Sequence, residues 1–149
     1  MAIGFYCNRE VVITEPDTTV LDAAQMMRTH HVGTLVIVDK STGVAKPKGI
    51  ITDRDLVISV MAQNLKADTI QVADIMSESL YTVHEDENMT DAMRLMRSHG
   101  VRRILVVDRE GALQGIMSVD DMVTLLADEM QEMANLIAHG QKRERAERR

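Results

Sequence analysis

The chain repeats itself, and this repeat limits its fold more than any other feature. Asp22-Ala23 recurs as Asp91-Ala92, and Met27 recurs as Met96 at the same separation. Farther along, the separation between matching residues shortens, and the difference falls in residues 40–48, where a loop insertion costs little. A chain of 149 residues with this pattern is best explained as two similar units that share one globule.

Both halves predict the same order of elements. Each has a helix start with a capping side chain and an acid three residues later, at Thr19 and at Asn88. Short β-branched runs of the kind found in strands buried on both faces follow. The remaining predicted features are early strands at 11–13 and 80–83, buried strands at 35–38 and 104–107, turns at Gly43 and Gly111, strands at 49–51 and 115–117, and helices from near Asp53 and Val119.

These elements define the predicted fold class. It is α/β (α+β), with two tandem β-α-β-β-α repeats packed through their sheets. We expect repeat 1 at residues 8–66, repeat 2 at 74–131, and a helical extension with a charged tail at 132–149.

The last helix carries an apolar stripe that outlasts the repeat. Its members step by three or four residues, as on one face of a helix, and Gly140 is the expected stop. Two interpretations stay open: the stripe packs on the chain's own core, or it is the seam of a dimer. The stripe consists of Met122, Leu126, Met130, Met133 and Ile137.

One motif occurs in both repeats where a buried strand meets a helix. It reads Gly, two apolar residues, a hydroxyl residue, two variable positions and Asp, from Gly49 to Asp55 and from Gly115 to Asp121. Thr52 with Asp55, like Ser118 with Asp121, fits a capping box that needs no ligand. The same groups also suit a nucleotide, because a helix N-terminus binds phosphate and a carboxylate accepts from ribose hydroxyls. Its doubling in a divergent repeat favours the functional interpretation.

With these motifs the chain resembles a tandem pair of CBS repeats, a Bateman module, over residues 11–130. The resemblance rests on the turn before each buried strand (His30-His31-Val32 and His99-Gly100-Val101), the strand ends Asp39 and Asp108, and the doubled Gly-x-x-Thr/Ser-x-x-Asp motif. It implies a pseudo-twofold pair with two clefts, frequent dimerisation, and an adenosine-containing ligand such as AMP, ADP, ATP, S-adenosylmethionine or NAD.

The resemblance also implies how each cleft is assembled from both repeats. One cleft is expected to combine Thr52, Arg54 and Asp55 with Tyr81, Val101, Arg102 and Arg103. The other is expected to combine Ser118 and Asp121 with Val12, Val32 and Gly33. Guanidinium groups suit phosphate, and Asp120 replaces Arg54 in the second cleft. We therefore expect the Asp55 cleft to bind an anionic nucleotide more tightly, with Cys7 near the adenine edge of one cleft.

Composition limits the partners. A net charge of −6 argues against general binding to nucleic acid or an anionic membrane. A single cysteine and no long apolar segment predict a cytoplasmic protein. We expect no metal site and no catalytic residues, and so no enzyme, since the five histidines lack metal-ligand spacing and no base–nucleophile pair is evident.

The expected role is that of a regulatory ligand sensor, which we expect to be a homodimer and to signal to an unknown effector protein. Two other hypotheses stay open. One is a structural or dimerisation module without ligand; the other is a nucleotide hydrolase.

Overall fold

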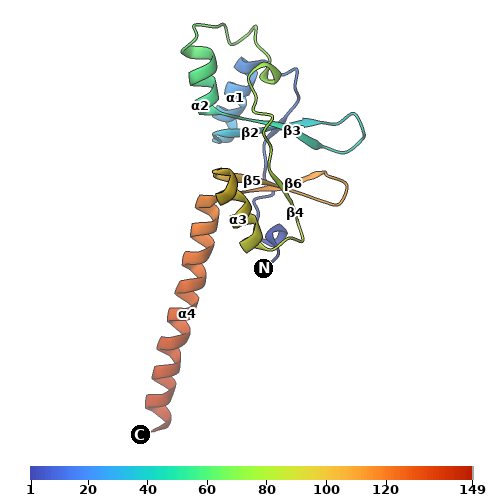
Figure 1. Ribbon diagram of the computed structural model, residues 1–149. Helices are drawn as coiled ribbons and strands as arrows, with labels where there is room; N and C mark the ends of the chain where they lie inside the picture. Colours follow the sequence, from blue (N-terminus) through green and yellow to red (C-terminus); the bar gives the residue numbers. More distant parts are fainter. Residues whose placement is uncertain (149) are drawn as a thin grey trace.

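In the computed structural model, which describes residues 1–148, the chain forms the two predicted β-α-β-β-α units followed by a long helix (Figure 1). Repeat 1 contains β1 (Ile13–Thr14), α1 (Val20–His30), β2 (Thr34–Asp39), β3 (Lys46–Thr52) and α2 (Asp53–Leu56), which continues as the π-helical turn η2 (Val57–Met61). Repeat 2 contains β4 (Thr82–His84), α3 (Met89–His99), β5 (Arg103–Val107), β6 (Leu113–Ser118) and α4 (Val119–Glu147). Short 3₁₀ turns, η1 (Ile3–Phe5) and η3 (Val72–Asp74), precede the two repeats.

Local signals set most boundaries as predicted. The Thr19 side chain caps α1 by accepting from the Asp22 N–H, and Asn88 caps α3 by accepting from Thr90. Gly43 and Gly111 turn the chain with positive φ angles of 86° and 80°, a conformation that glycine adopts at no steric cost. The early strands are the exception, because β1 and β4 begin two residues later than predicted.

Each repeat builds a three-stranded sheet, in the orders β1-β2-β3 and β4-β5-β6. The first pair in each sheet is parallel and the second is antiparallel. In β2 the four residues from Leu35 to Val38 are at most 1% exposed, which confirms the prediction of strands covered on both faces.

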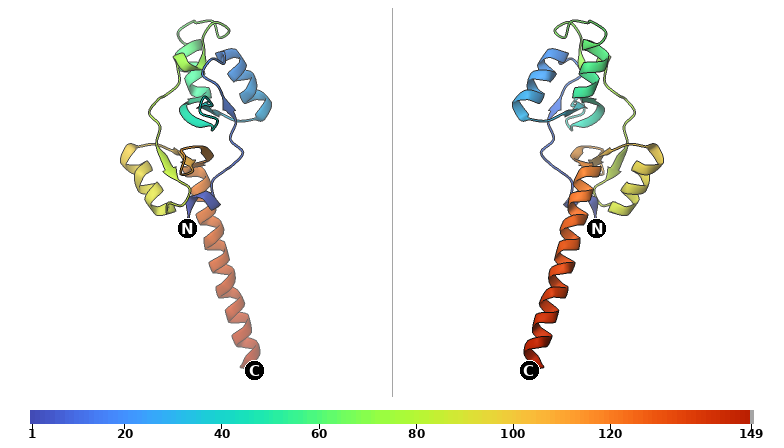
Figure 2. Two further views of the ribbon diagram at one scale, coloured as in Figure 1. Left: turned by 90° about the vertical axis from the view of Figure 1, so that its right-hand side faces the viewer. Right: turned by 90° about the vertical axis from the view of Figure 1, so that its left-hand side faces the viewer.

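The two sheets pack on each other. One face of each sheet packs on the helices of its own repeat, and the other face contributes to a shared cluster around Val36, Val38 and Leu105. This cluster includes residues of both repeats, so burial of its apolar surface holds the repeats together. Figure 2 shows the two lobes lying against each other, seen from two opposite sides.

The segments before each repeat are exchanged between the two lobes. Asn8 pairs with Ile116 of β6 in repeat 2, and Ser77 pairs in the same way with Ile50 of β3 in repeat 1. Ile3 is fully buried in the core of repeat 2, and the N-terminus accordingly lies beside that repeat (Figure 1). Each repeat is therefore completed by chain that precedes the other.

Helix α4 departs from two expectations. It has 29 residues and runs through Gly140 to Glu147, so the prediction that Gly140 stops it was wrong. A glycine costs an exposed helix only about 1 kcal/mol, and good helix-forming residues follow it. Met122 is buried against the core of repeat 2, whereas Val123 is 60% exposed, so the exposed stripe begins at Val123. Beyond its root, α4 projects away from the globule (Figures 1 and 2). Among residues 1–148, no helix is long and apolar enough to cross a membrane.

Candidate ligand cleft

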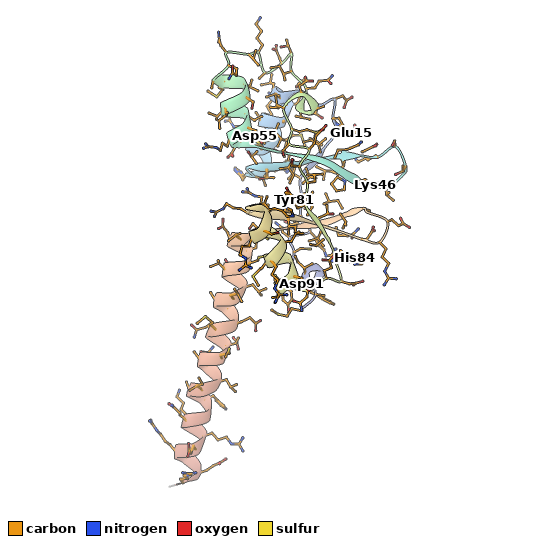
Figure 3. All side chains as sticks on the ribbon, in the orientation of Figure 1. Glu15, Lys46, Asp55, Tyr81, His84 and Asp91 are labelled. Atoms are coloured by element: carbon orange, nitrogen blue, oxygen red, sulfur yellow. The ribbon has the colours of Figure 1, made fainter. Side chains whose placement is uncertain are left out.

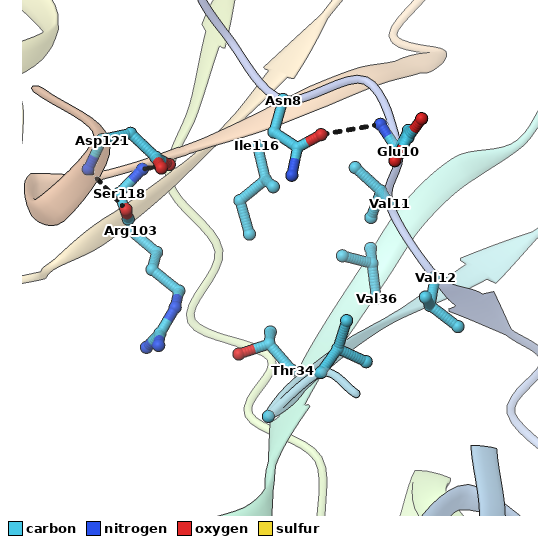
Figure 4. A pocket seen from close by; sticks show the side chains of 12 residues that line it. Asn8, Glu10, Val11, Val12, Thr34, Val36, Arg103, Ile116, Ser118 and Asp121 are labelled. Carbon is cyan, nitrogen blue, oxygen red and sulfur yellow. Dashed lines mark hydrogen bonds between the residues drawn. The ribbon is translucent and has the colours of Figure 1, made fainter. Parts of the chain in front are cut away.

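An open cavity of about 210 Å³ lies between the two repeats. One wall comes from β6 and the first turn of α4, and the other from the segment before β1 and the start of β2 (Figure 4). The cavity therefore brings together the five residues expected in the Asp121 cleft. Its lining residues are Asn8, Glu10, Val11, Val12, Val32, Gly33, Thr34, Val36, Arg103, Ile116, Ser118 and Asp121.

Ser118 and Asp121 form a complete capping box at the start of α4. The Ser118 N–H donates to Asp121 Oδ2 at 3.0 Å, and the Asp121 N–H donates to Ser118 Oγ at 3.1 Å. This cap does not consume the carboxylate, because an ionised carboxyl group has about four acceptor sites. The structural and ligand-binding interpretations of the motif are thus compatible at this position.

Arg103 is the residue whose place differs from the expected one. It was expected in the Asp55 cleft, but it lines the Asp121 cavity, where it is the only basic lining residue among residues 1–148. The reason is strand register: β5 and β6 are antiparallel, and Arg103 lies directly opposite Ser118. In Figure 4 its side chain extends from this wall toward Thr34.

Arg102 is also drawn away from the expected phosphate site. Its Nη2 donates to Asp120 Oδ1 at 3.4 Å, and both side chains are largely exposed. Asp120 does not line the Asp121 cavity, so the expected repulsion between its carboxylate and a phosphate loses its basis. The predicted cluster of three arginines around Asp55 is therefore not assembled.

The other half of the pseudo-twofold pair carries the matching motif. The Thr52 N–H donates to Asp55 Oδ2 at 2.8 Å, and the Asp55 N–H donates to Thr52 Oγ1 at 3.3 Å. Thr34 lies opposite Thr52 in the sheet, at the position that Arg103 occupies in repeat 2. The Asp55 side thus has the same capping box as the Asp121 side, but it has the neutral Thr34 where the Asp121 side has the cationic Arg103.

The remaining residues expected in the Asp55 cleft lie in separate places and do not line one common cavity. Arg54 is exposed on the first turn of α2. Tyr81 is half-buried and stacks on His99, with ring centroids 4.1 Å apart and planes at 19°. Val101 is half-buried and lines a different, apolar groove beside α3 and α4. Asp55 and Tyr81 lie on facing sides of the interface between the repeats in Figure 3.

Several cavity residues were missed from the sequence. Asn8, Glu10 and Val11 belong to the exchanged N-terminal segment, and Asn8 holds its bend by accepting from the Glu10 N–H at 2.9 Å. The sequence feature that pointed to this crossing segment was Gly115, which corresponds to Gly49 in the repeated motif. A Cβ on Gly115 would lie 2.6 Å from Cys7 Sγ and 2.7 Å from the Asn8 carbonyl oxygen, so this glycine marks a crossing segment.

Cys7 does not line the cavity. It is buried beneath Gly115 in the core of repeat 2, directly before the lining residue Asn8. Burial raises the pKa of the Cys7 thiol, which keeps it protonated and unreactive.

Metal chemistry finds no support in the part of the chain that the structure describes. There, no group of three or more His, Cys, Asp or Glu side chains is placed to hold a metal ion. The cavity instead offers a carboxylate, a hydroxyl group, a guanidinium group and apolar walls, which is a set suited to binding rather than to activating a nucleophile.

Two sheet-forming repeats that exchange their preceding segments, with a cleft between them, define a paired-repeat module. The CBS domain model matches residues 3–62 and 72–128, and the chain belongs to the CBS domain family.

Other proteins resemble the chain over most of its length. An uncharacterised protein of Methanopyrus kandleri, MK0525, is 38% identical over 123 residues, which are 83% of this chain and 61% of that protein. The chain therefore spans less than two thirds of that relative.

Two solved structures are similar in fold and were determined with ligands. The CBS domain pair of MJ0100, in complex with 5′-methylthioadenosine and S-adenosyl-L-methionine, has a TM-score of 0.73 at 26% identity and covers 87% of this chain and 98% of that one. The CBS domain protein PAE2072 of Pyrobaculum aerophilum, complexed with AMP, has a TM-score of 0.71 at 25% identity and covers 81% of this chain and 89% of that one.

Proposed function

We propose that this chain is a regulatory module that binds an adenosine-containing mononucleotide, with the Asp121 cavity as its primary site. The observation that carries the proposal is the convergence of Ser118, Asp121 and Arg103 on one open cavity between the repeats. The AMP, S-adenosylmethionine and methylthioadenosine complexes of structurally similar CBS proteins support the adenosine class.

Each cavity group has a role in this proposal. The Asp121 carboxylate accepts from the ribose hydroxyls, and the apolar wall of Val12 and Val32 holds the adenine ring. Arg103 and the start of α4, which carries the positive end of the helix dipole, receive the phosphate. Gly33 lines the same wall, and a Cβ there would lie 3.0 Å from Asp53 Oδ2.

The cavity is small for a dinucleotide. Its volume of about 210 Å³ lies below the roughly 300–1,000 Å³ of sites that enclose drug-sized ligands, so a mononucleotide would extend to its open mouth and NAD would extend well beyond it. The proposed preference for the Asp121 side replaces the earlier expectation for the Asp55 side, because Arg103 faces the former. The Asp55 side, with Thr52, remains a second and weaker candidate.

In this proposal the chain signals rather than catalyses. Ligand binding favours one relative orientation of the repeats, and an effector protein responds to that orientation. The alternative of a purely structural module predicts the same capping boxes but no stabilisation by any nucleotide.

The test is a thermal-shift titration with AMP, ADP, ATP, S-adenosylmethionine and NAD. A ligand at a hundred times its Kd stabilises the folded state by about 2.7 kcal/mol, which raises the Tm of a chain of this size by roughly 5–11 °C. Asp121→Asn is the informative variant, because the amide oxygen can still accept from the Ser118 N–H while one ribose acceptor is lost. Asp55→Asn is the matched control.

A shift that Asp121→Asn removes and Asp55→Asn retains is the expected result. Loss in Asp55→Asn alone would move the primary site to the other cleft. No shift with any of the five compounds would favour the structural module, and turnover of ATP by the pure protein would revive the hydrolase hypothesis.

A further inference from the structure

Two polar side chains of the Asp121 cavity have no role in the ribose and phosphate contacts described above. Asn8 and Glu10 both line the cavity. In Figure 4 Asn8 lies between Asp121 and Glu10, and Arg103 lies on the side of Asp121. In the proposed function the ribose is at Asp121 and the base lies on Val12, so one edge of the base faces Asn8 and Glu10.

Asn8 is held in place by its main chain and by its own side chain. Its N–H donates to the Ile116 carbonyl oxygen, and its carbonyl oxygen accepts from the Ile116 N–H, both at 2.9 Å. Its Oδ1 accepts from the Glu10 N–H at 2.9 Å. Because a backbone N–H only donates, this contact identifies the amide oxygen and leaves the NH₂ group to donate toward the cavity. Asn8 therefore presents a fixed donor to a ligand.

Glu10 presents the complementary acceptor. Its side chain is exposed, and an ionised carboxylate accepts hydrogen bonds without donating any. The neighbouring cation, Arg9, is engaged elsewhere, since its Nη2 lies 3.6 Å from Glu85 Oε2 and donates to the Gly4 carbonyl oxygen at 2.8 Å. The Glu10 carboxylate thus stays available to a ligand.

The order of these two groups matches one edge of adenine. N7, an acceptor, belongs to the ring that carries the ribose, and the N6 amine, a donor, lies farther from the ribose on the same edge. Asn8 is the nearer of the two side chains to Asp121 in Figure 4, and Glu10 is the farther. We propose that Asn8 donates to N7 and Glu10 accepts from N6, so that the two side chains select adenine. This inference rests on the proposed function, because it needs the ribose at Asp121.

Bases with a carbonyl group at position 6 do not fit this pair. Hypoxanthine and guanine carry the acceptor O6 where adenine carries its amine. The Glu10 carboxylate would then face a second acceptor, so a hydrogen bond is lost and a repulsive contact replaces it. Because Glu10 is exposed, we expect a modest preference for adenine over hypoxanthine, of about tenfold in Kd.

The corresponding segment before β4 has different side chains at these positions. Ser77 takes the place of Asn8 on the other sheet, and Ser79 takes the place of Glu10. A serine hydroxyl both donates and accepts, so it suits an amine and a carbonyl group equally. Base selection is therefore a property of the Asp121 side.

Calorimetric titration with AMP and IMP tests the role of Glu10, because the two bases differ at position 6 but share N7. The wild type should bind AMP about tenfold more tightly than IMP. In Glu10→Gln the side-chain amide can rotate to donate to O6, so IMP should bind more tightly and the preference should fall toward one. The matched control is Glu78→Gln, which removes an exposed carboxylate from the segment before β4 and should keep the preference. A preference for AMP that survives Glu10→Gln would overturn the role of Glu10.

The role of Asn8 is tested with 7-deaza-AMP, in which a C–H group replaces N7. The wild type should bind AMP several-fold more tightly than 7-deaza-AMP. Asn8→Asp keeps the oxygen that accepts from the Glu10 N–H but replaces the donor by a second oxygen, so this preference should disappear. The added charge acts equally on both nucleotides and cancels in their ratio. An unchanged ratio in Asn8→Asp would refute the contact with N7.

The same titrations separate a failure of this inference from a failure of the proposed function. Equal binding of AMP, IMP and 7-deaza-AMP by the wild type would refute base selection by Asn8 and Glu10 while the nucleotide-binding function stands. No binding of AMP by the wild type would overturn the proposed function, and the base selection with it.

Discussion

Arg103→Gln tests most directly whether Arg103 binds the phosphate of a nucleotide in the Asp121 cavity. The glutamine keeps much of the side chain and a hydrogen-bond donor but removes the charge. A hydrogen bond to a charged group contributes about 1.5–3 kcal/mol, and Arg103 is exposed, which places its contribution at the lower end. At about 1.4 kcal/mol per factor of ten, we expect the Kd for AMP to rise roughly tenfold.

The comparison ligand is adenosine, which lacks the phosphate that Arg103 is proposed to receive. Its Kd should be unchanged by Arg103→Gln, so the preference for AMP over adenosine falls by the same roughly tenfold factor. Isothermal titration calorimetry with both ligands measures this ratio directly. In the wild type the ratio should also fall as salt is raised, because the charges are solvent-accessible and the Debye length is about 8 Å at 0.15 M.

Arg54→Gln is the matched control, since Arg54 belongs to the other cleft and should not affect the ratio. Equal weakening of adenosine and AMP by Arg103→Gln would mean that the arginine shapes the cavity and does not bind phosphate. If Arg54→Gln instead lowered the preference for AMP over adenosine, the assignment of the phosphate to the Asp121 side would be refuted.

Three further predictions concern the scaffold. Gly115→Ala should lower the Tm measurably, because the new Cβ would lie 2.7 Å from the Asn8 carbonyl oxygen and overpacking of this kind costs about 1–3 kcal/mol. His31→Gly should raise the Tm slightly, since His31 ends α1 with a φ of 54° where Gly100 ends α3, and a non-glycine residue there is strained by about 1–2 kcal/mol. The Cys7 thiol should react with a disulfide reagent only after denaturation. Its pKa is raised by burial, so its contribution to stability is full below the pKa of the unfolded thiol and is lost as the pH rises through the folded value.

The elements of the fold were predictable because their signals are local. Capping at Thr19 and Asn88, the β-branched runs and the turn glycines act within a few residues. Repetition then doubled the evidence for each element, and the fold class was confirmed. The stop at Gly140 failed because a glycine is tolerated where strong helix formers follow it.

The site was only partly predictable because its composition depends on contacts between distant segments. The exchanged N-terminal segment brings Asn8 beside Ile116, and the only sequence feature that indicates this contact is Gly115. Arg103 was placed on the wrong side because pairing with Ser118 is a matter of strand register. Periodicity shows that a strand exists but leaves its register open when both faces are buried.

The position of the cavity gives α4 a mechanical role in the proposed function. Ser118 and Asp121 lie at the root of α4, and Val12 and Val32 lie on the other repeat, so a ligand that contacts both walls fixes the angle of α4 to repeat 1. A helix of 29 residues extends about 44 Å, and a rotation of about 5° at its root moves its far end by roughly 4 Å. We therefore expect a ligand in the cavity to displace the far end of α4 relative to repeat 1.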